Sequence, residues 1–447
     1  MDFVKLARTH QEEMLNDLFE LIKIESTYDE TTISTNAPFG QKIREALDAM
    51  LLKGKQDGFT TKDIDGYAGR ISYGNGQTSV SLLGHLDVVP GLKEQFNPFI
   101  KEGFVVGRGS LDDKGPTLAA YYAMRILKDC GYQFKHRIDL IVGCDEENEM
   151  RCMEYYKQHE ELPLKGLVPD ADFPGVFAEK GILNVDLVLP NDSKILAMKA
   201  GTRPNVVIAQ AVATLEPDVV CDNYDFYLRS HQVSGEQEAN KLTLNGEAYH
   251  ASQPYLGKNA GLLLLNYIAT LTSDDSLLNV IKHLSNEFGL GFDLEYESAQ
   301  MGPLTINVGL IHVDENEIRL TLDIRYPKEL NAQEILKTIA SKGDWALENI
   351  LDSHPHYVNP NMEFVQSALA AYQKVTGDVQ SDLKSIGGGT YARTFPNHIA
   401  FGLDFPTREK PAWVQGPHQD HEAVEIEALI LATAIYCEAL ITLAEKI

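Results

Sequence analysis

The sequence lacks several features that would place it in other classes of protein. Lys and Arg number 39 against 65 Asp and Glu, and the net charge of −26 argues against binding to nucleic acid. No window offers the roughly 18 uninterrupted apolar residues of a membrane span, and the first residues lack the basic and apolar regions of a signal peptide. We therefore expect a cytoplasmic protein that binds neither membranes nor nucleic acid.

The cysteines are also few and unpatterned. There are five, an odd number, widely spaced and without a Cys-x-x-Cys pair. This argues against a disulfide framework and against a thiolate zinc site. We expect the thiols to be reduced and mostly buried.

What the sequence does contain is the pattern of an α/β protein of more than one domain. A chain of 447 residues is too long for one ordinary core. Helical periods and buried strands alternate in the first part, with helices expected at 4–24, 41–52 and 117–127 and strands ending at 85 and 143. This order is typical of a mixed, largely parallel sheet flanked by helices.

The middle of the chain has a different pattern. Strands in which apolar and polar residues alternate are expected at 184–189, 305–310 and 318–324, with helices at 260–271 and 277–288. The α/β pattern of the first part then returns, and the chain closes with a helix at 428–444. We therefore predict a domain formed by 1–182 plus 359–447, and an α+β domain, 183–358, inserted into it.

The run at 79–90 reads as a buried strand that ends in a His-x-Asp pair, His85 and Asp87. Residues two apart on a strand point to the same side, so the carboxylate of Asp87 can hydrogen-bond the ring of His85 and fix its tautomer. The alternative is a single histidine in an ordinary turn.

Further ligand-type side chains follow other predicted strands. The whole set is His85, Asp112, Glu146, Glu147, Asp170 and His418. The adjacent acids at 145–147 repel one another unless a cation or solvent offsets their charge. A solvated acidic loop is the alternative for these acids alone, but the full set matches the requirements of two zinc-like ions bridged by a carboxylate.

Five motifs in order along the chain carry a resemblance to a known family. They are GHLDVVP at 84–90, GRGSLDDKGP at 107–116, DEE at 145–147, PDADFP at 169–174 and GPH at 416–418. The chain resembles the M20 family of zinc metallopeptidases, and within it the bacterial dipeptidases of the PepV type. The implied fold is a zinc-peptidase catalytic domain of the α/β class with an inserted α+β lid.

The resemblance also implies the roles of the site residues. Asp112 would bridge two Zn²⁺ ions, for which Mn²⁺ or Co²⁺ could substitute. The remaining ligands would be His85 and Asp170 for one ion and Glu147 and His418 for the other. Glu146 would be the general base, Asp87 would orient its histidine as part of the catalytic set, and the Asp112–Asp113 peptide bond would be cis.

The inserted domain carries weaker matches. His250, in GEAYHASQP at 246–254, resembles the lid histidine that stabilises the oxyanion, and Asn205 resembles a substrate contact. Arg325 and the glycines Gly387, Gly388 and Gly389 would bind the carboxylate of a short peptide. The alternatives are a polar loop residue for His250, a strand-edge salt bridge for Arg325 and a flexible turn for the glycines.

Together these features predict a dipeptidase that uses an activated water and a Glu base to cleave small peptides. The alternatives are another M20 hydrolase, such as an aminoacylase, tripeptidase, carboxypeptidase or desuccinylase, or a non-catalytic peptide-binding protein. The insert of roughly 175 residues exceeds an ordinary lid. We therefore expect it to contain two sheet-helix units, one imitating a partner's lid, and the enzyme to be a monomer.

Overall fold

The computed structural model describes residues 1–445, which form two compact units. Among the described residues, unit 1 consists of 1–177, 358–384 and 389–445. Unit 2 consists of Ala178–Tyr357 and Ser385–Gly388. The predicted division, 1–182 plus 359–447 and 183–358, differs by a few residues at both boundaries, and it left the segment 385–388 in the first domain. Its carbonyl at Gly387 accepts a hydrogen bond from Arg325 of unit 2, which accounts for its place there.

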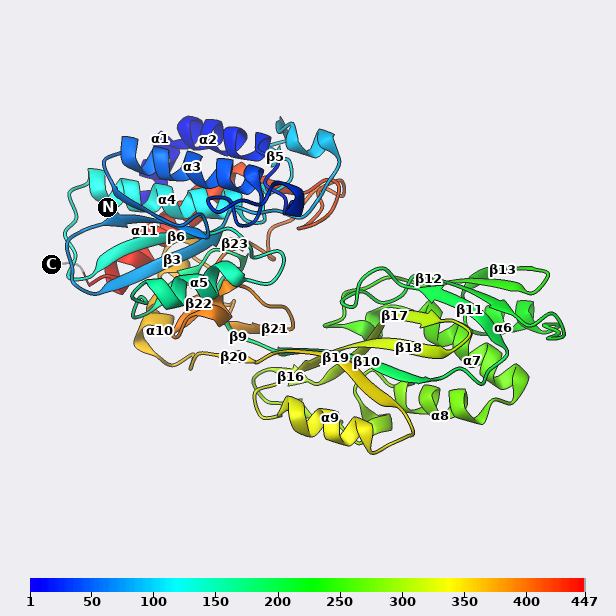
Figure 1. Ribbon diagram of the computed structural model, residues 1–447. Coiled ribbons are helices and arrows are strands. Elements are labelled where there is room, and N and C mark those ends of the chain that lie inside the picture. Colours follow the sequence, from blue (N-terminus) through cyan, green and yellow to red (C-terminus); the bar gives the residue numbers. More distant parts are fainter. Residues whose placement is uncertain (446–447) are drawn as a thin grey trace. The chain divides into compact units, whose positions relative to one another are not determined.

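Unit 1 is built on a mixed sheet with helices on both faces (Figure 1). In spatial order its strands are β1 (Thr60–Ile64), β2 (Ala68–Tyr73), β6 (Arg137–Gly143), β3 (Ser79–His85), β7 (Gly166–Val168), β22 (His398–Ala400) and β9 (Val176–Glu179), whose last two residues belong to unit 2. The neighbours from β6 to β22 run parallel. The predicted mixed α/β fold is confirmed.

The helices of unit 1 include the predicted ones, with ends that differ by a few residues, and two that were not predicted, α5 (Arg151–His159) and α10 (Glu363–Thr376). The others are α1 (Phe3–Thr9), α2 (Gln11–Lys23), α3 (Gln41–Gln56), α4 (Lys114–Asp129) and α11 (Ile426–Leu443). The helix predicted at 4–24 is in fact two helices that meet at His10. Helix α11 has the length and apolar composition of a membrane span, but most of its side chains are buried inside unit 1, as in a core helix.

Short strands complete unit 1. A three-stranded sheet contains β24 (Ala423–Glu425), β5 (Phe104–Val106) and β4 (Phe99–Lys101), and a parallel pair contains β8 (Ala171–Asp172) and β23 (Leu403–Asp404). Strand β21 (Lys384–Ile386) crosses the unit boundary.

The parallel pairing of β3 and β6 brings distant segments of the sequence to one edge of the sheet. All residues of β3 are buried, and His85 at its end lies beside Gly143 at the end of β6. Gly84 permits close packing of α4, because a Cβ there would lie 2.0 Å from the hydroxyl of Thr117. The loops after these strands therefore start side by side, at the carboxyl ends where open α/β sheets place ligands.

Unit 2 contains one eight-stranded antiparallel sheet. In spatial order its strands are β13 (Ser234–Glu238), β14 (Lys241–Asn245), β12 (Gln210–Leu215), β11 (Ile195–Ala200), β17 (Thr305–Val313), β18 (Glu317–Tyr326), β10 (Gly181–Pro190) and β19 (Ala346–Ser353). The two expected sheet-helix units are thus joined, through the pairing of β11 with β17.

Helices and sheet of unit 2 share one core. The helices are α6 (Tyr224–Ser230), α7 (Ala260–Thr272), α8 (Asp275–Leu284) and α9 (Ala332–Ala340), and the short strands are β15 (Glu297–Ser298), β16 (Gly302–Pro303) and β20 (His356–Tyr357). Leu264 of α7 and Ile335 of α9 are buried with alternate residues of β10, such as Leu183 and Val185. Burial of about 25 cal/mol per Å² of apolar surface is the main stabilising contribution of such a core.

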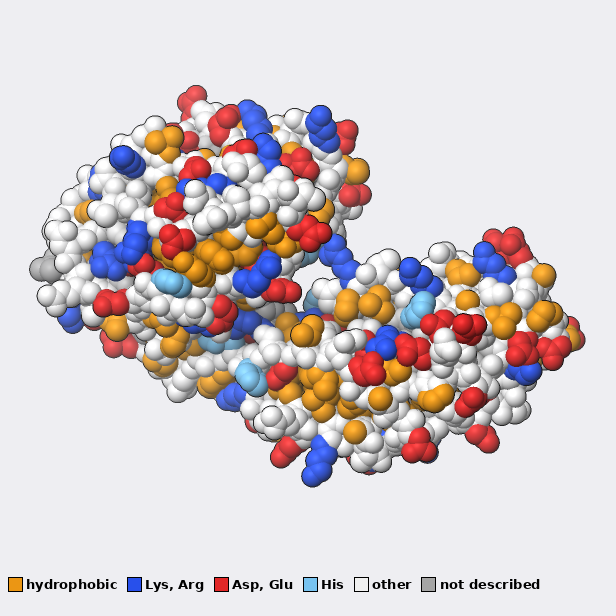
Figure 2. All heavy atoms as spheres, in the orientation of Figure 1, with side chains coloured by type: hydrophobic (Ala, Val, Ile, Leu, Met, Phe, Trp, Pro, Cys, Tyr) orange, Lys and Arg blue, Asp and Glu red, His pale blue; other side chains and the backbone are white. Residues whose placement is uncertain are grey.

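Charged side chains of both signs are interspersed over the visible face of each unit (Figure 2). Many form pairs, such as Arg8 with Glu427 at 2.7 Å in unit 1 and Lys258 with Glu247 at 2.8 Å in unit 2. Exposed pairs of this kind contribute only about 0–1 kcal/mol each. The stability of both units therefore rests on their apolar cores.

Candidate metal centre and substrate residues

His85 is fully buried, and its ring is oriented from the end of its own strand. Nδ1 lies 2.9 Å from the main-chain oxygen of Asp87 and 3.6 Å from that residue's carboxylate. The predicted side-chain hydrogen bond is therefore made by the carbonyl instead, because the chain turns directly after the strand. Nδ1–H donates to this carbonyl, which leaves Nε2 to act as a ligand atom.

The carboxylate of Asp87 has a different partner. Its Oδ2 accepts a hydrogen bond of 2.9 Å from the main-chain N–H of Glu147. Asp87 thus ties the loop after β3 to the loop after β6, and it orients the acidic pair as well as its histidine.

Asp112 faces both histidines at once. Its Oδ1 lies 3.0 Å from Nε2 of His85, and its Oδ2 lies 3.0 Å from Nε2 of His418. A carboxylate whose two oxygens face different imidazoles has the geometry of a bridging ligand. The Asp112–Asp113 peptide bond is cis, as the sequence resemblance implied.

The ligand-type residues gather into two groups. One contains His85, Glu146 and Asp170, and the other contains Asp112, Glu147 and His418, with the ligand atoms of each group within 4.8 Å of one another. Nε2 of His418 lies 3.0 Å from a carboxylate oxygen of Glu147, and Nε2 of His85 lies 3.8 Å from Asp170. The structure therefore brings together all six residues of the sequence-predicted centre, with Glu146 in the first group.

Burial and crowding perturb the acids strongly. Burial raises the pKa of Glu146 and of Asp170 well above the usual values, and the neighbouring carboxylates add to the effect. Burial also acts to raise the pKa of Asp112, but hydrogen bonds with His418 and His85 outweigh it and hold that pKa well below its usual range. Desolvation opposes the charged form of His418, yet Asp112 and Glu147 raise its pKa to about 10.

The donor set fits divalent cations. Carboxylate oxygens and imidazole nitrogens are ligands that Zn²⁺ accepts, and carboxylates also suit Mn²⁺. Crowded, buried acids are costly to ionise unless positive charge offsets them. Each of the two groups therefore has the donors that a divalent cation accepts.

Two residues that the sequence did not single out for the site support Asp112. The buried carboxylate of Glu422 accepts hydrogen bonds from the main-chain N–H of Leu111 at 3.0 Å and of Asp112 at 3.2 Å, and from Nη1 of Arg108 at 2.7 Å. The sequence signal that could have identified Glu422 was its place four residues after His418. A buried acid at such a place requires hydrogen-bond or ion-pair partners.

In unit 2 the predicted substrate residues also converge. Val206 forms a β-bridge with His250, and the carbonyl of Asn205 accepts a hydrogen bond of 2.9 Å from the N–H of Ala251. The two weak motifs of the inserted domain are therefore paired through their main chains. They lie about 45 residues apart in the sequence.

The contacts of Arg325 favour a salt bridge on its strand over direct contact with a substrate. It is 3% exposed, and its guanidinium donates to both carboxylate oxygens of Asp323, at 2.5 and 2.7 Å. Nη1 donates to the carbonyl of Gly387 at 2.8 Å. Strand residues two apart share a face, which explains the pairing within β18. Arg325 thus fixes the segment that contains Gly387 and Gly388, while Gly389 belongs to unit 1.

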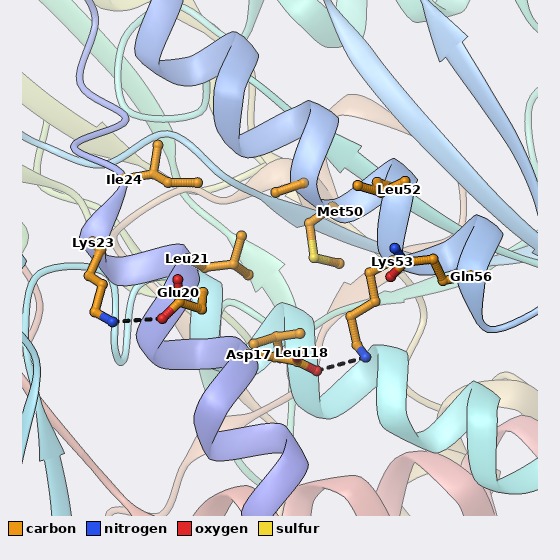
Figure 3. Close-up of a pocket in the computed structure, with 11 residues that line it drawn as sticks. Asp17, Glu20, Leu21, Lys23, Ile24, Met50, Leu52, Lys53, Gln56 and Leu118 are labelled. Carbon is orange, nitrogen blue, oxygen red and sulfur yellow. Dashed lines mark hydrogen bonds and ion pairs between the residues drawn. The ribbon is translucent and has the colours of Figure 1, made fainter.

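A pocket of about 500 Å³ opens between α2, α3 and α4 (Figure 3). Its walls carry the ion pairs of Lys53 with Asp17 at 2.8 Å and of Lys23 with Glu20 at 2.6 Å. Its described lining contains none of the candidate site residues. The carbonyls of two lining residues, Leu21 and Ile24, accept hydrogen bonds from the buried amine of Lys114. The pocket wall is thus connected to the segment that follows Asp112.

Comparisons with known proteins found matches over most of the chain. The profile of peptidase family M20/M25/M40 matches residues 81–442. The chain is 35% identical to the Bacillus subtilis protein named "Putative dipeptidase YtjP", with 97% of this chain and 98% of that protein covered. It is 37% identical to "Putative dipeptidase SH1171" of Staphylococcus haemolyticus, with 98% of each covered.

Solved structures share the fold. The di-peptidase Dug1p of Saccharomyces cerevisiae has a TM-score of 0.62 and 14% identity, with 99% of this chain and 98% of that chain covered. Human carnosine dipeptidase 1 has a TM-score of 0.60 and 13% identity, with the same coverage.

Proposed function

The chain belongs to peptidase family M20/M25/M40, a family of peptide hydrolases, and from this premise we propose that it is a dipeptidase that depends on two zinc ions. The observation that carries the proposal is the position of Asp112, whose two oxygens each lie 3.0 Å from a different histidine. Two relatives that match nearly the whole chain are named putative dipeptidases, and this supports dipeptides as the substrate class.

In this proposal His85 and Asp170 would hold one ion, Glu147 and His418 would hold the other, and Asp112 would contribute to both. Bound zinc lowers the pKa of water towards about 7 and withdraws charge from a carbonyl, so hydroxide is available at neutral pH. Mn²⁺ or Co²⁺ could replace zinc, because the donors are oxygen and nitrogen.

Glu146 is the proposed general base. One of its carboxylate oxygens accepts a proton from the attacking water as the new C–O bond forms, and the same oxygen returns that proton to the leaving nitrogen as the C–N bond breaks. Its place beside His85 and Asp170, together with a pKa raised by burial, suits a group that must both accept and release a proton.

Unit 2 is the proposed lid. His250 donates a hydrogen bond to the oxyanion as charge develops on it, and Asn205 contacts the substrate. Gly387, Gly388 and Gly389 offer main-chain N–H groups to the free carboxylate of the peptide. Because Arg325 already donates to both carboxylate oxygens of Asp323 and to the carbonyl of Gly387, we assign it the fixing of this segment in place of direct contact with the substrate carboxylate.

A panel of substrates tests the proposal. Dipeptides, tripeptides and N-acyl amino acids of matched side chains would be compared by kcat/KM on the zinc-loaded enzyme. We expect dipeptides to be cleaved at least tenfold faster than the other classes. Equal or higher kcat/KM for tripeptides or N-acyl amino acids would assign the chain another activity within the family.

A further inference from the structure

One ring nitrogen of His250 has two contacts within its own loop. Its Nδ1 lies 2.8 Å from the hydroxyl of Ser252 and 3.2 Å from the main-chain N–H of the same residue. Both contacts are made within unit 2, by a residue two positions further along the loop.

The main-chain contact decides the role of Nδ1. A backbone N–H can only donate, so the nitrogen that it faces must offer a lone pair. The hydroxyl of Ser252, which rotates freely, then donates to the same lone pair. A neutral imidazole has one proton, which must therefore reside on Nε2.

The main chain of this loop is itself fixed. The N–H of Ala251 donates to the carbonyl of Asn205 at 2.9 Å, and the carbonyl of Ala251 accepts from the hydroxyl of Thr305 at 3.4 Å. Ala251 is buried. The N–H of Ser252 thus cannot turn away from Nδ1 without breaking these contacts.

The side chain of Ser252 is confined from the other direction by Gly387. A Cβ added at Gly387 would lie 2.3 Å from Cβ of Ser252, so only glycine fits there. The carbonyl of Gly387 is held by Arg325, which Asp323 holds in turn. Buried ion-paired groups therefore set the position of the serine that contacts the histidine.

We propose that Ser252 is a positioning residue that keeps neutral His250 in the Nε2–H form, so that Nε2 is the donor presented to the substrate. The inference deepens the proposed function, because the use made of Nε2–H rests on the oxyanion role of His250. The tautomer itself rests only on contacts within unit 2.

The tautomer is tested by nitrogen NMR of the full-length protein carrying ¹⁵N-labelled histidine, with His250→Ala used to assign the signals. At a pH where the ring is neutral, we expect Nδ1 of His250 to show the shift of an unprotonated nitrogen. In Ser252→Ala the shorter hydroxyl contact is lost and only the main-chain N–H, at 3.2 Å, still favours a lone pair on Nδ1, so we expect a measurable fraction of the ring to carry its proton on Nδ1. A wild-type ring protonated on Nδ1, or a spectrum unchanged by Ser252→Ala, would overturn the proposal.

Kinetics give a second readout. Ser252→Ala should lower kcat on the order of tenfold, the worth of one hydrogen bond, with KM nearly unchanged, since the contact acts in the transition state. The matched control is Ser230→Ala, because the hydroxyl of Ser230, the last residue of α6, lies 3.1 Å from Nδ1 of the following residue, His231. It should leave kcat unchanged. An unchanged kcat in Ser252→Ala would overturn the positioning role.

Gly387→Ala separates this proposal from a role of Gly387 in substrate binding alone. The added methyl group must displace Ser252, so the His250 signals should move in the free enzyme. Signals that stay in place would show that Ser252 is not confined as we infer. Full activity of His250→Ala would instead contradict the oxyanion role, and the NMR result would stand independently.

Discussion

The carboxylate of Glu422 accepts a hydrogen bond from the main-chain N–H of Asp112, with a donor–acceptor distance of 3.2 Å. The two residues lie 310 positions apart in the sequence. A buried acid on the segment after His418 thus sets the path of the loop that presents the bridging carboxylate. Groups that orient metal ligands in this way commonly affect metal affinity as much as tenfold to a hundredfold.

Glu422→Gln should therefore weaken zinc binding by roughly 10- to 100-fold. The amide retains one acceptor oxygen but loses the charge that pairs with Arg108. Competition with a chromophoric chelator measures the affinity. Glu425→Gln is the matched control, since the described hydrogen bonds of the Glu425 side chain, both at 2.6 Å, come from Arg408 and from no candidate ligand. Equal affinities in both variants would show that Glu422 does not position Asp112.

The adjacent acids Glu146 and Glu147 are expected to respond differently to the same change. Glu146→Gln should retain two metal ions and lose on the order of 10²–10⁴-fold in kcat, the usual contribution of an acid–base group. Glu147→Gln should lose metal, because its carboxylate lies 3.0 Å from His418 in the second group. Metal analysis combined with kcat measures both. Metal loss in Glu146→Gln with metal kept in Glu147→Gln would reverse the two roles.

Arg325→Ala should destabilise the fold more than it affects substrate binding. Removing the guanidinium leaves the carboxylate of Asp323, which is 1% exposed, as an unpaired buried charge. Such a loss costs about 3–5 kcal/mol, which denaturant unfolding can measure. Arg319→Ala, on the same strand but with a partly exposed side chain, should cost far less. A stable Arg325→Ala protein with only a raised KM would restore the direct contact with the substrate carboxylate.

The active enzyme is expected to be a monomer. Unit 2 contains an eight-stranded sheet in which β11 and β17 join two four-stranded halves, so one chain has the strands that two smaller lids would supply. Activity per chain should not fall on dilution, and a mixture of Glu146→Gln with His250→Ala should stay inactive. Recovered activity in the mixture would mean that the histidine acts between chains.

The sequence was most informative where the end of a single strand determines the position of a functional side chain. His85, Asp112 and Glu147 follow buried strands or a glycine-rich loop, and parallel pairing must then bring their loops together. The family motifs supplied the order of the ligands.

What the sequence did not reveal depends on which partner each polar group finds after folding. The choice of a carbonyl for the ring of His85 arises from the turn after the strand, and the partners of Glu422 lie far away in the sequence. The Asp323–Arg325 pair was accessible in principle, because residues two apart on a strand share a face. The inclusion of 385–388 in unit 2 follows only from contacts such as Arg325 with Gly387.

The central claim is that Asp112 joins two metal ions in a hydrolytic centre. The most direct test is to remove metal with a chelator and titrate zinc back, measuring dipeptide hydrolysis and bound zinc in the same samples. We expect no activity without metal, and activity that reaches its maximum at two zinc ions per chain. Activity that survives chelation, or zinc content that stays at zero while the enzyme is fully active, would contradict the account.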